Sequence, residues 1–162
     1  ELETEHTFTA VFVSQAVADS PFTVFASEDA GSPMEDEATV RFFHALVGGG
    51  EVDVCVAGAT ARAEATPMFA DVSPNAFGSA AGTQFADVAA SGEVVVQLRA
   101  HSSPACRGRV AGVARFTPTA GSSYTLVAVG RTTGQPRADR EMLICPDAPA
   151  DGSCTVAPIS AH

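Results

Sequence analysis

Apolar and polar residues alternate in short segments along most of this chain, which is the pattern of β-strands that bury one face. In residues 38–58 two such runs flank a glycine-rich connection, so we predict that they pair as a hairpin. In the second run valine occupies every other position, at Val52, Val54 and Val56. We expect this valine face to line the core and Cys55 to point the other way, toward solvent or toward a segment lying over the sheet.

Further alternating segments are separated by turns rich in Gly, Pro and Ser, and no amphipathic helical pattern of ten or more residues occurs. We therefore predict an all-β fold, an antiparallel immunoglobulin-like β-sandwich of seven to nine strands. The segment at residues 93–100 alternates most regularly, with its apolar residues expected inward and Gln97 outward. The tail at residues 157–162 is expected to fray or to continue into a linker. Outside residues 38–58, the predicted strands are residues 6–17, 22–26, 67–72, 84–88, 93–100, 110–117, 123–131 and 141–145.

We predict two parts, an N-terminal β arm with an acidic linker at residues 1–37 and a β-sandwich domain at residues 38–162. The first strand, residues 6–17, is apolar on both faces, and such a strand needs a layer over each face. Residues 27–37 form an acidic loop with Gly and Pro, which is typical of a linker. Two interpretations of the arm stay open: it completes its own sandwich, or it adds a strand to a neighbouring copy and joins subunits. The residues of this assembly strand are Phe8, Ala10, Val11, Phe12 and Val13.

Composition narrows the range of functions and compartments. The 162 residues are enough to form one self-sufficient core, and 19 acidic residues against nine arginines and no lysine give a formal charge of −10. Such a surface repels phosphate, so we expect no nucleic-acid binding through a basic patch. No apolar run reaches the roughly 20 residues of a membrane-spanning helix. We expect an exported protein, extracellular or at the cell surface, whose signal peptide has already been removed.

The four cysteines show no C-x-x-C spacing, which argues against a zinc ribbon or a thioredoxin-like motif. Three disulfide pairings are possible. We favour Cys145 with Cys154, because prolines and a glycine make the stretch between them a tight loop. Cys55 then pairs with Cys106, since Cys55 leaves the sheet on its outer face, where the loop that carries Cys106 can reach it. Two disulfides, each contributing about 2–4 kcal/mol, indicate an oxidising compartment.

Three stretches resemble the bacterial domain-of-unknown-function family numbered 4397, whose members are exported β-sandwich modules of surface proteins. Residues 40–45 (VRFFHA) resemble the family's opening strand, residues 52–56 (VDVCV) its second strand, and residues 124–130 (YTLVAVG) a late strand. Residues 85–99 are compatible with its valine-rich hairpin. The glycine-rich connection after the first strand differs from the Ser-Pro-Asp-Ala-Pro turn common in the family. Over about residues 38–145, the resemblance implies an exported sandwich without an established catalytic role.

The histidines do not form a recognisable metal or catalytic motif. His44 shares a face with apolar residues, so we expect a core-edge histidine that is hydrogen-bonded to a backbone carbonyl. The other three, His6, His101 and His162, are far apart in sequence and show no H-E-x-x-H spacing, so the sequence does not support a zinc site. No G-x-S-x-G motif of a serine hydrolase occurs. We therefore expect neither an enzyme nor a cofactor.

Two charged clusters are candidate binding sites. Residues 107–109 (Arg-Gly-Arg), next to Cys106, form either a carboxylate-binding spot or a solvated loop. The acidic loop offers oxygen ligands of the kind that Ca²⁺ prefers in extracellular modules. It lacks the D-x-D-x-D-G order, so we favour a solvated linker over a calcium site. The weak calcium candidates are Glu28, Asp29, Glu35, Asp36 and Glu37.

From these features we predict a non-enzymatic, exported structural or interaction module that associates with itself or with other surface proteins. A self-assembling subunit of an extracellular filament, or part of an adhesive surface structure, fits the apolar arm. The alternative is a surface domain that binds carbohydrates or small molecules with the assistance of Ca²⁺.

Overall fold

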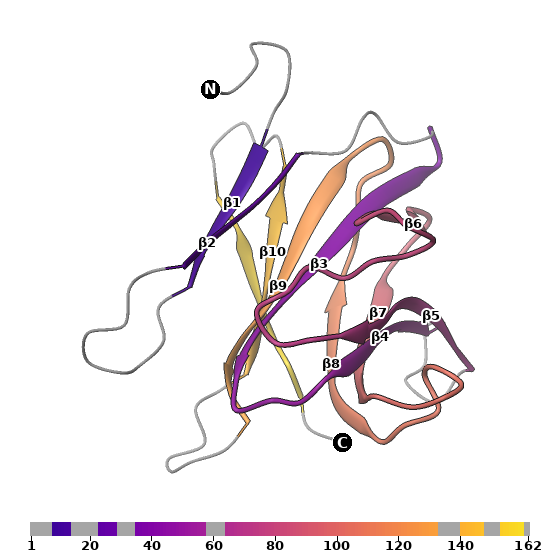
Figure 1. Cartoon of the computed structure of the whole chain (residues 1–162). Coiled ribbons are helices and arrows are strands. Elements are labelled where there is room, and N and C mark those ends of the chain that lie inside the picture. Colours follow the sequence, from indigo (N-terminus) through magenta and orange to yellow (C-terminus); the bar gives the residue numbers. More distant parts are fainter. Residues whose placement is uncertain are drawn as a thin grey trace.

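The structure is a computed structural model that describes residues 8–13, 23–28, 35–57, 64–132, 140–147 and 153–160. These residues form eleven β-strands and no helix, as the alternating pattern predicts (Figure 1). Among the described residues there is no helix of the length and apolarity needed to cross a membrane.

Nine of the strands form two sheets that pack face to face, which confirms the predicted β-sandwich. The five-stranded sheet has the order β11-β10-β9-β3-β6, and the four-stranded sheet the order β5-β4-β7-β8. All the strand pairs are antiparallel except β3 with β9. The first sheet contains β3 (Glu37–Val47), β6 (Ala86–Ala89), β9 (Ser123–Arg131), β10 (Glu141–Pro146) and β11 (Thr155–Pro158). The second contains β4 (Val52–Ala57), β5 (Ala65–Val72), β7 (Val94–Ala100) and β8 (Val110–Phe116).

The hairpin predicted within residues 38–58 is wrong, because its two strands belong to different sheets. β3 pairs with β9 and β6, whereas β4 pairs with β5 and β7. The connection through Gly48, Gly49 and Gly50 therefore carries the chain from one sheet across to the other. Alternation along a strand shows which side chains face the core, but it does not show which strand lies along either edge.

The core lies between the two sheets and is built from their inward-facing apolar side chains. The valine face of β4 packs into this core as predicted, with Val54 fully buried and Val56 half-buried. From β7 the side chains of Val94, Val96 and Leu98 face the same core. Fully burying one large aliphatic or aromatic side chain stabilises the fold by about 1.5–3 kcal/mol. Members of this core include Val40, Phe42, Leu46, Val54, Met68, Phe69, Val96, Leu98, Tyr124, Leu126, Met142, Ile144 and Ile159.

Part of the outer face of the four-stranded sheet is also buried. Cys55 points away from the core, as predicted, and lies beneath the loop that carries Cys106. Gln97 lies opposite Cys55 on β7 and is fully buried rather than exposed to solvent. Its amide oxygen accepts a hydrogen bond of 2.8 Å from Nε of Arg99. The loop thus acts as a second layer over this face.

The expectation that the tail frays is wrong for its described residues. β11 adds to the edge of the five-stranded sheet, and the next residue, Ile159, is buried in the core. Ser160 then exchanges two backbone hydrogen bonds of 3.0 Å with Val113 of β8. The tail therefore joins the two sheets along one side, because a buried isoleucine and a disulfide at Cys154 hold it in place.

The arm forms a separate antiparallel ribbon of β1 (Phe8–Val13) and β2 (Thr23–Glu28), paired from Phe8 with Glu28 to Val13 with Thr23. In Figure 1 the ribbon lies on one side of the five-stranded sheet, and the four-stranded sheet lies on the other. Within the described residues, β1 pairs with β2 and with neither sheet of the sandwich. β1 therefore does not extend either sheet of the sandwich as an additional strand.

Candidate functional site

One end of the four-stranded sheet carries a buried carboxylate that collects four hydrogen bonds. Asp53 lies on the outer face of β4 and is 0% exposed. Its Oδ2 accepts hydrogen bonds from the backbone N–H of Ser102 (3.1 Å), the hydroxyl of Ser102 (3.2 Å) and the backbone N–H of Cys106 (3.0 Å). Its Oδ1 accepts one from the backbone N–H of Asp71 (3.2 Å). Asp53 thus ties the loop after β7 and the end of β5 to β4.

The hydrogen bonds determine the charge state of this carboxylate. Burial by itself raises the pKa of Asp53, because it disfavours the ionised form. The backbone N–H groups of Cys106 and Asp71, together with the hydroxyl and backbone N–H of Ser102, favour the ionised form and outweigh burial. The net pKa lies below the ordinary aspartate value, so Asp53 is a buried anion at neutral pH.

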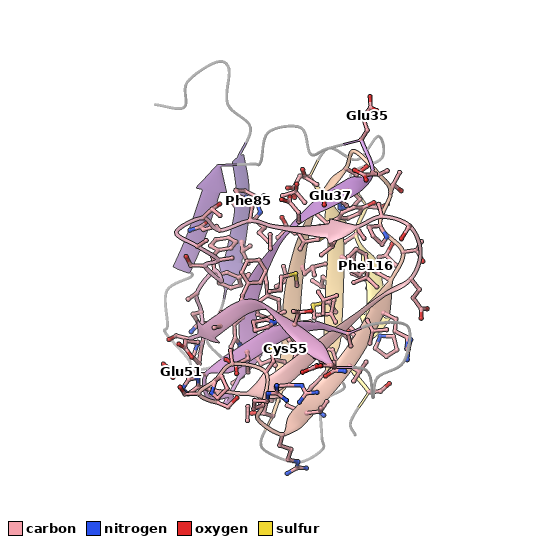
Figure 2. The ribbon with its side chains drawn as sticks, turned by 90° about the vertical axis from the view of Figure 1, so that its right-hand side faces the viewer. Glu35, Glu37, Glu51, Cys55, Phe85 and Phe116 are labelled. Carbon is pink, nitrogen blue, oxygen red and sulfur yellow. A yellow bond between two sulfur atoms is a disulfide. The ribbon has the colours of Figure 1, made fainter. Side chains whose placement is uncertain are left out.

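A disulfide holds the same loop two residues further along β4. Cys55 is bonded to Cys106, and Cys145 to Cys154, which is the pairing favoured from the sequence (Figure 2 labels Cys55). Gly108 completes the loop, because a Cβ at this position would lie 1.9 Å from the carbonyl oxygen of Ala100. The loop is therefore held by the Cys55–Cys106 disulfide, by hydrogen bonds to the Asp53 carboxylate and by the close approach of its backbone at Gly108 to Ala100. Two disulfides are typical of proteins in oxidising compartments.

His101 lies at the rim of this loop between two carboxylates. Its Nδ1 contacts Oδ1 of Asp71 and lies 3.6 Å from Oδ1 of Asp53. His101 and Asp71 are partly exposed, with side chains 42% and 61% exposed. The ligand atoms of the three residues all lie within 4.8 Å of one another, so this group can hold a metal ion.

The histidine spacing did not indicate this cluster, because its members come from three different strands. Asp53 lies at the start of β4, Asp71 at the end of β5, and His101 directly after β7. The register brings these positions together, since Val52 pairs with both Val72 and Ala100. The signal in the sequence was a polar residue near one end of each of three predicted strands. It becomes informative only once the order and direction of the strands are known.

His44 is the core-edge histidine that we predicted. It is fully buried, and its Nε2–H donates a hydrogen bond of 2.9 Å to the carbonyl oxygen of Gly50. Its Nδ1 accepts one of 3.3 Å from the backbone N–H of Leu46. Burial lowers the pKa of His44 despite the hydrogen bond to Gly50, so the imidazole is neutral. These hydrogen bonds stabilise the conformation of the glycine-rich connection between β3 and β4.

A second buried charge lies on the outer face of the five-stranded sheet. Arg41 of β3 is 0% exposed, and its Nε donates a 2.8 Å hydrogen bond to the hydroxyl of Thr125, which in turn donates one of 2.6 Å to Asp147. Nη2 of Arg41 lies 3.4 Å from the same carboxylate oxygen of Asp147. The guanidinium also lies over the rings of Phe77 and Phe85, 5.9 and 5.3 Å from their centroids. These partners of Arg41 belong to the fold, which indicates a structural role.

The described calcium candidates are not members of this metal-capable group, and Arg107 lies in the loop that covers Asp53. Among the described residues the metal-capable group consists of Asp53, Asp71 and His101, without the acidic loop. Arg107 lies 3.2 Å from the carboxylate of Glu64, so it is paired within the chain. Of the calcium candidates, Glu28 ends β2, Glu35 and Asp36 are exposed in a turn, Glu37 begins β3 (Figure 2 labels Glu35 and Glu37), and Asp29 lies outside the described residues.

The predicted assembly strand corresponds to β1 of the ribbon. Ala10 is exposed and Val11 is half-buried, while Val24 of β2 is 51% exposed. The side chains of Phe8, Phe12 and Val13 lie outside the described ones.

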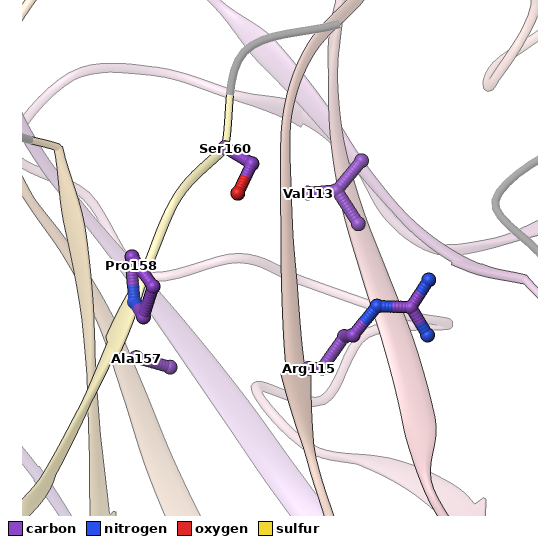
Figure 3. Close-up of a pocket in the computed structure, with 5 residues that line it drawn as sticks. All are labelled: Val113, Arg115, Ala157, Pro158 and Ser160. Carbon is purple, nitrogen blue, oxygen red and sulfur yellow. The ribbon is translucent and has the colours of Figure 1, made fainter.

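A hollow of about 320 Å³ lies between β8 and β11, the edge strands of the two sheets. Figure 3 shows β8 running beside the C-terminal segment that forms the other wall. Its volume is at the low end for ligand sites, and none of its described lining residues has an aromatic ring on which a sugar could stack. The lining residues are Val113, Arg115, Ala157, Pro158 and Ser160.

No family model, curated protein or solved structure matches the chain.

Proposed function

We propose that this protein is an exported, non-enzymatic structural or interaction module that associates with itself through the β1–β2 ribbon, as the subunit of an extracellular filament or adhesive surface structure. The observation that carries the proposal is the separation of the ribbon from both sheets of the sandwich. The two disulfides support export, because they persist in oxidising compartments. The resemblance of residues 40–45, 52–56 and 124–130 to an exported sandwich family also favours export.

Strand edges are the reason for expecting association. A two-stranded ribbon is marginally stable alone, and each of its strands has a second edge whose N–H and C=O groups can pair with another chain. Within the described residues, the ribbon has no strand partner beyond its own two strands. Addition of a strand from another copy provides main-chain hydrogen bonds and covers exposed apolar groups such as Val24. A head-to-tail contact that does not close produces a filament.

Two surface valines provide a matched test. Val24 in β2 and Val156 in β11 are 51% and 52% exposed, so an aspartate at either position has a similar direct cost to folding. We expect Val24→Asp to weaken self-association at least tenfold and Val156→Asp to leave it unchanged, measured by light scattering after size-exclusion chromatography over a concentration series. Electron microscopy of the wild type shows whether the assemblies are filaments.

A deletion of residues 1–34 extends the test to the whole arm. The remaining sandwich keeps both disulfides, so we expect a folded protein that no longer assembles, with folding checked by near-ultraviolet circular dichroism. A wild-type chain that stays monomeric at all concentrations would overturn the proposal. Assembly that survives the deletion would place the joint elsewhere on the molecule.

A further inference from the structure

We propose that Asp53, Asp71 and His101 form a binding site for one divalent transition-metal ion of the Zn²⁺ type. The inference is independent of the proposed self-association. Two carboxylate oxygens and one imidazole nitrogen are a donor set that suits Zn²⁺ and its neighbours in the first transition row. Ca²⁺ and Mg²⁺ prefer oxygen ligands alone, so the imidazole favours the transition metal over both.

The spacing of the ligand atoms fits a shared ion. Nδ1 of His101 and Oδ1 of Asp53 are 3.6 Å apart, which is longer than a normal N–H···O hydrogen bond. Two ligands that each lie about 2.1 Å from a tetrahedral zinc ion are separated by about 3.4 Å. The separation between these two atoms therefore matches the spacing of two ligands of one ion. Asp71 contacts the same Nδ1 and would provide the third ligand. A water molecule would complete a four-coordinate zinc site.

The site combines a rigid ligand with two adjustable ones. Asp53 is fully buried and held by four hydrogen-bond donors, so its side chain is already ordered and loses little conformational entropy when an ion binds. The backbone N–H of His101 donates a 3.2 Å hydrogen bond to the carbonyl of Glu51, which fixes the main chain beside the site. The carboxylate of Asp71 is 61% exposed and can turn outward to admit the ion between itself and the imidazole. The formal charge of −10 raises the local concentration of cations.

Zinc titration of the full chain with intact disulfides tests the site. We expect isothermal titration calorimetry to show one Zn²⁺ bound per chain through this cluster, a rise in melting temperature that EDTA reverses, and no comparable effect of Ca²⁺. Co²⁺ can be added in place of Zn²⁺, because the visible absorption spectrum of bound Co²⁺ depends on the ligands that coordinate the ion. Absence of zinc binding in the wild type would overturn the proposal.

Three variants assign the ligands. His101→Ala and Asp71→Asn change partly exposed side chains, so both fold, and each should weaken Zn²⁺ binding at least tenfold while the metal-free melting temperature stays within a few degrees of the wild type. Asp87→Asn is the matched control, because Asp87 is an exposed aspartate on β6, and it should bind zinc as the wild type does. Undiminished affinity in His101→Ala would show that zinc binds elsewhere, and the proposal would then be wrong.

Discussion

Replacing Asp53 by alanine should be one of the most destabilising changes in the four-stranded sheet, because it removes the acceptor of four hydrogen bonds from the loop and from β5. Hydrogen bonds to a charged group contribute about 1.5–3 kcal/mol each, but their contributions are not additive. Donors at the rim of the loop can also form hydrogen bonds to water once the carboxylate is removed. The backbone N–H of Cys106 is buried and stays without an acceptor. We therefore expect Asp53→Ala to lower the free energy of unfolding by about 3–5 kcal/mol.

Asp53→Asn refines this prediction. The amide oxygen can replace Oδ2 and keep the hydrogen bonds from Ser102 and Cys106, but its NH₂ group then faces the backbone N–H of Asp71. We expect a smaller loss, about 1–3 kcal/mol. For a chain of this size 1 kcal/mol lowers the melting temperature by roughly 2–4 °C, so the alanine variant should melt roughly 10 °C below the wild type.

The assay is urea unfolding at neutral pH, followed by circular dichroism without reductant so that the disulfides stay intact. Asp87→Ala is the control, because Asp87 is exposed and accepts a side-chain hydrogen bond from Thr39. This substitution should lower the free energy of unfolding by less than about 1 kcal/mol. A loss below about 1 kcal/mol in Asp53→Ala would refute the structural role of the carboxylate.

The pH dependence gives an independent check of the same reasoning. The pKa of Asp53 is lowered in the folded state, so the unfolded chain takes up a proton first, near the ordinary value of about 3.9. The stabilisation by Asp53 is therefore present above that value and is lost as the pH falls through the folded pKa. The stability gap between the wild type and Asp53→Ala should narrow in strong acid. If the difference in unfolding free energy between the wild type and Asp53→Ala stayed constant with pH, the charge of Asp53 would not be the source of the stabilisation.

Two further predictions concern the disulfides and the buried histidine. Because the loops closed by Cys55–Cys106 and Cys145–Cys154 span 51 and 9 residues, replacing both cysteines of the longer loop by alanine should cost about 4 kcal/mol, against about 2.5 kcal/mol for the shorter one, in urea unfolding. Equal losses would contradict the chain-entropy explanation. His44 is neutral because burial lowers its pKa, so stability should decline as the pH falls below the unfolded value of about 6.5. His44→Gln, which does not titrate, should show a smaller decline between pH 7 and 5, and an unchanged decline would assign the effect to other groups.

The sequence by itself determined the elements whose signals are local. Residues 123–131 were predicted as a strand and form β9 with the same bounds, because alternation and flanking turn residues act over a few positions. His44 was placed correctly at the edge of the core because its apolar neighbours on the same face indicated its environment. The cysteine pairing followed from a short loop and from the outward direction of Cys55.

Only the tertiary structure decided which strands are neighbours and which polar groups are buried. Strand alternation specifies a face but leaves both edges undefined, so nothing local showed that β3 pairs in parallel with β9, or that β3 and β4 lie in different sheets. For the same reason the sequence did not predict that Asp53, Asp71 and His101 lie close together, since their proximity depends on the order of β5, β4 and β7. Asp53 became a buried anion because a distant loop covers it and supplies its donors, and that covering depends on packing of the whole chain.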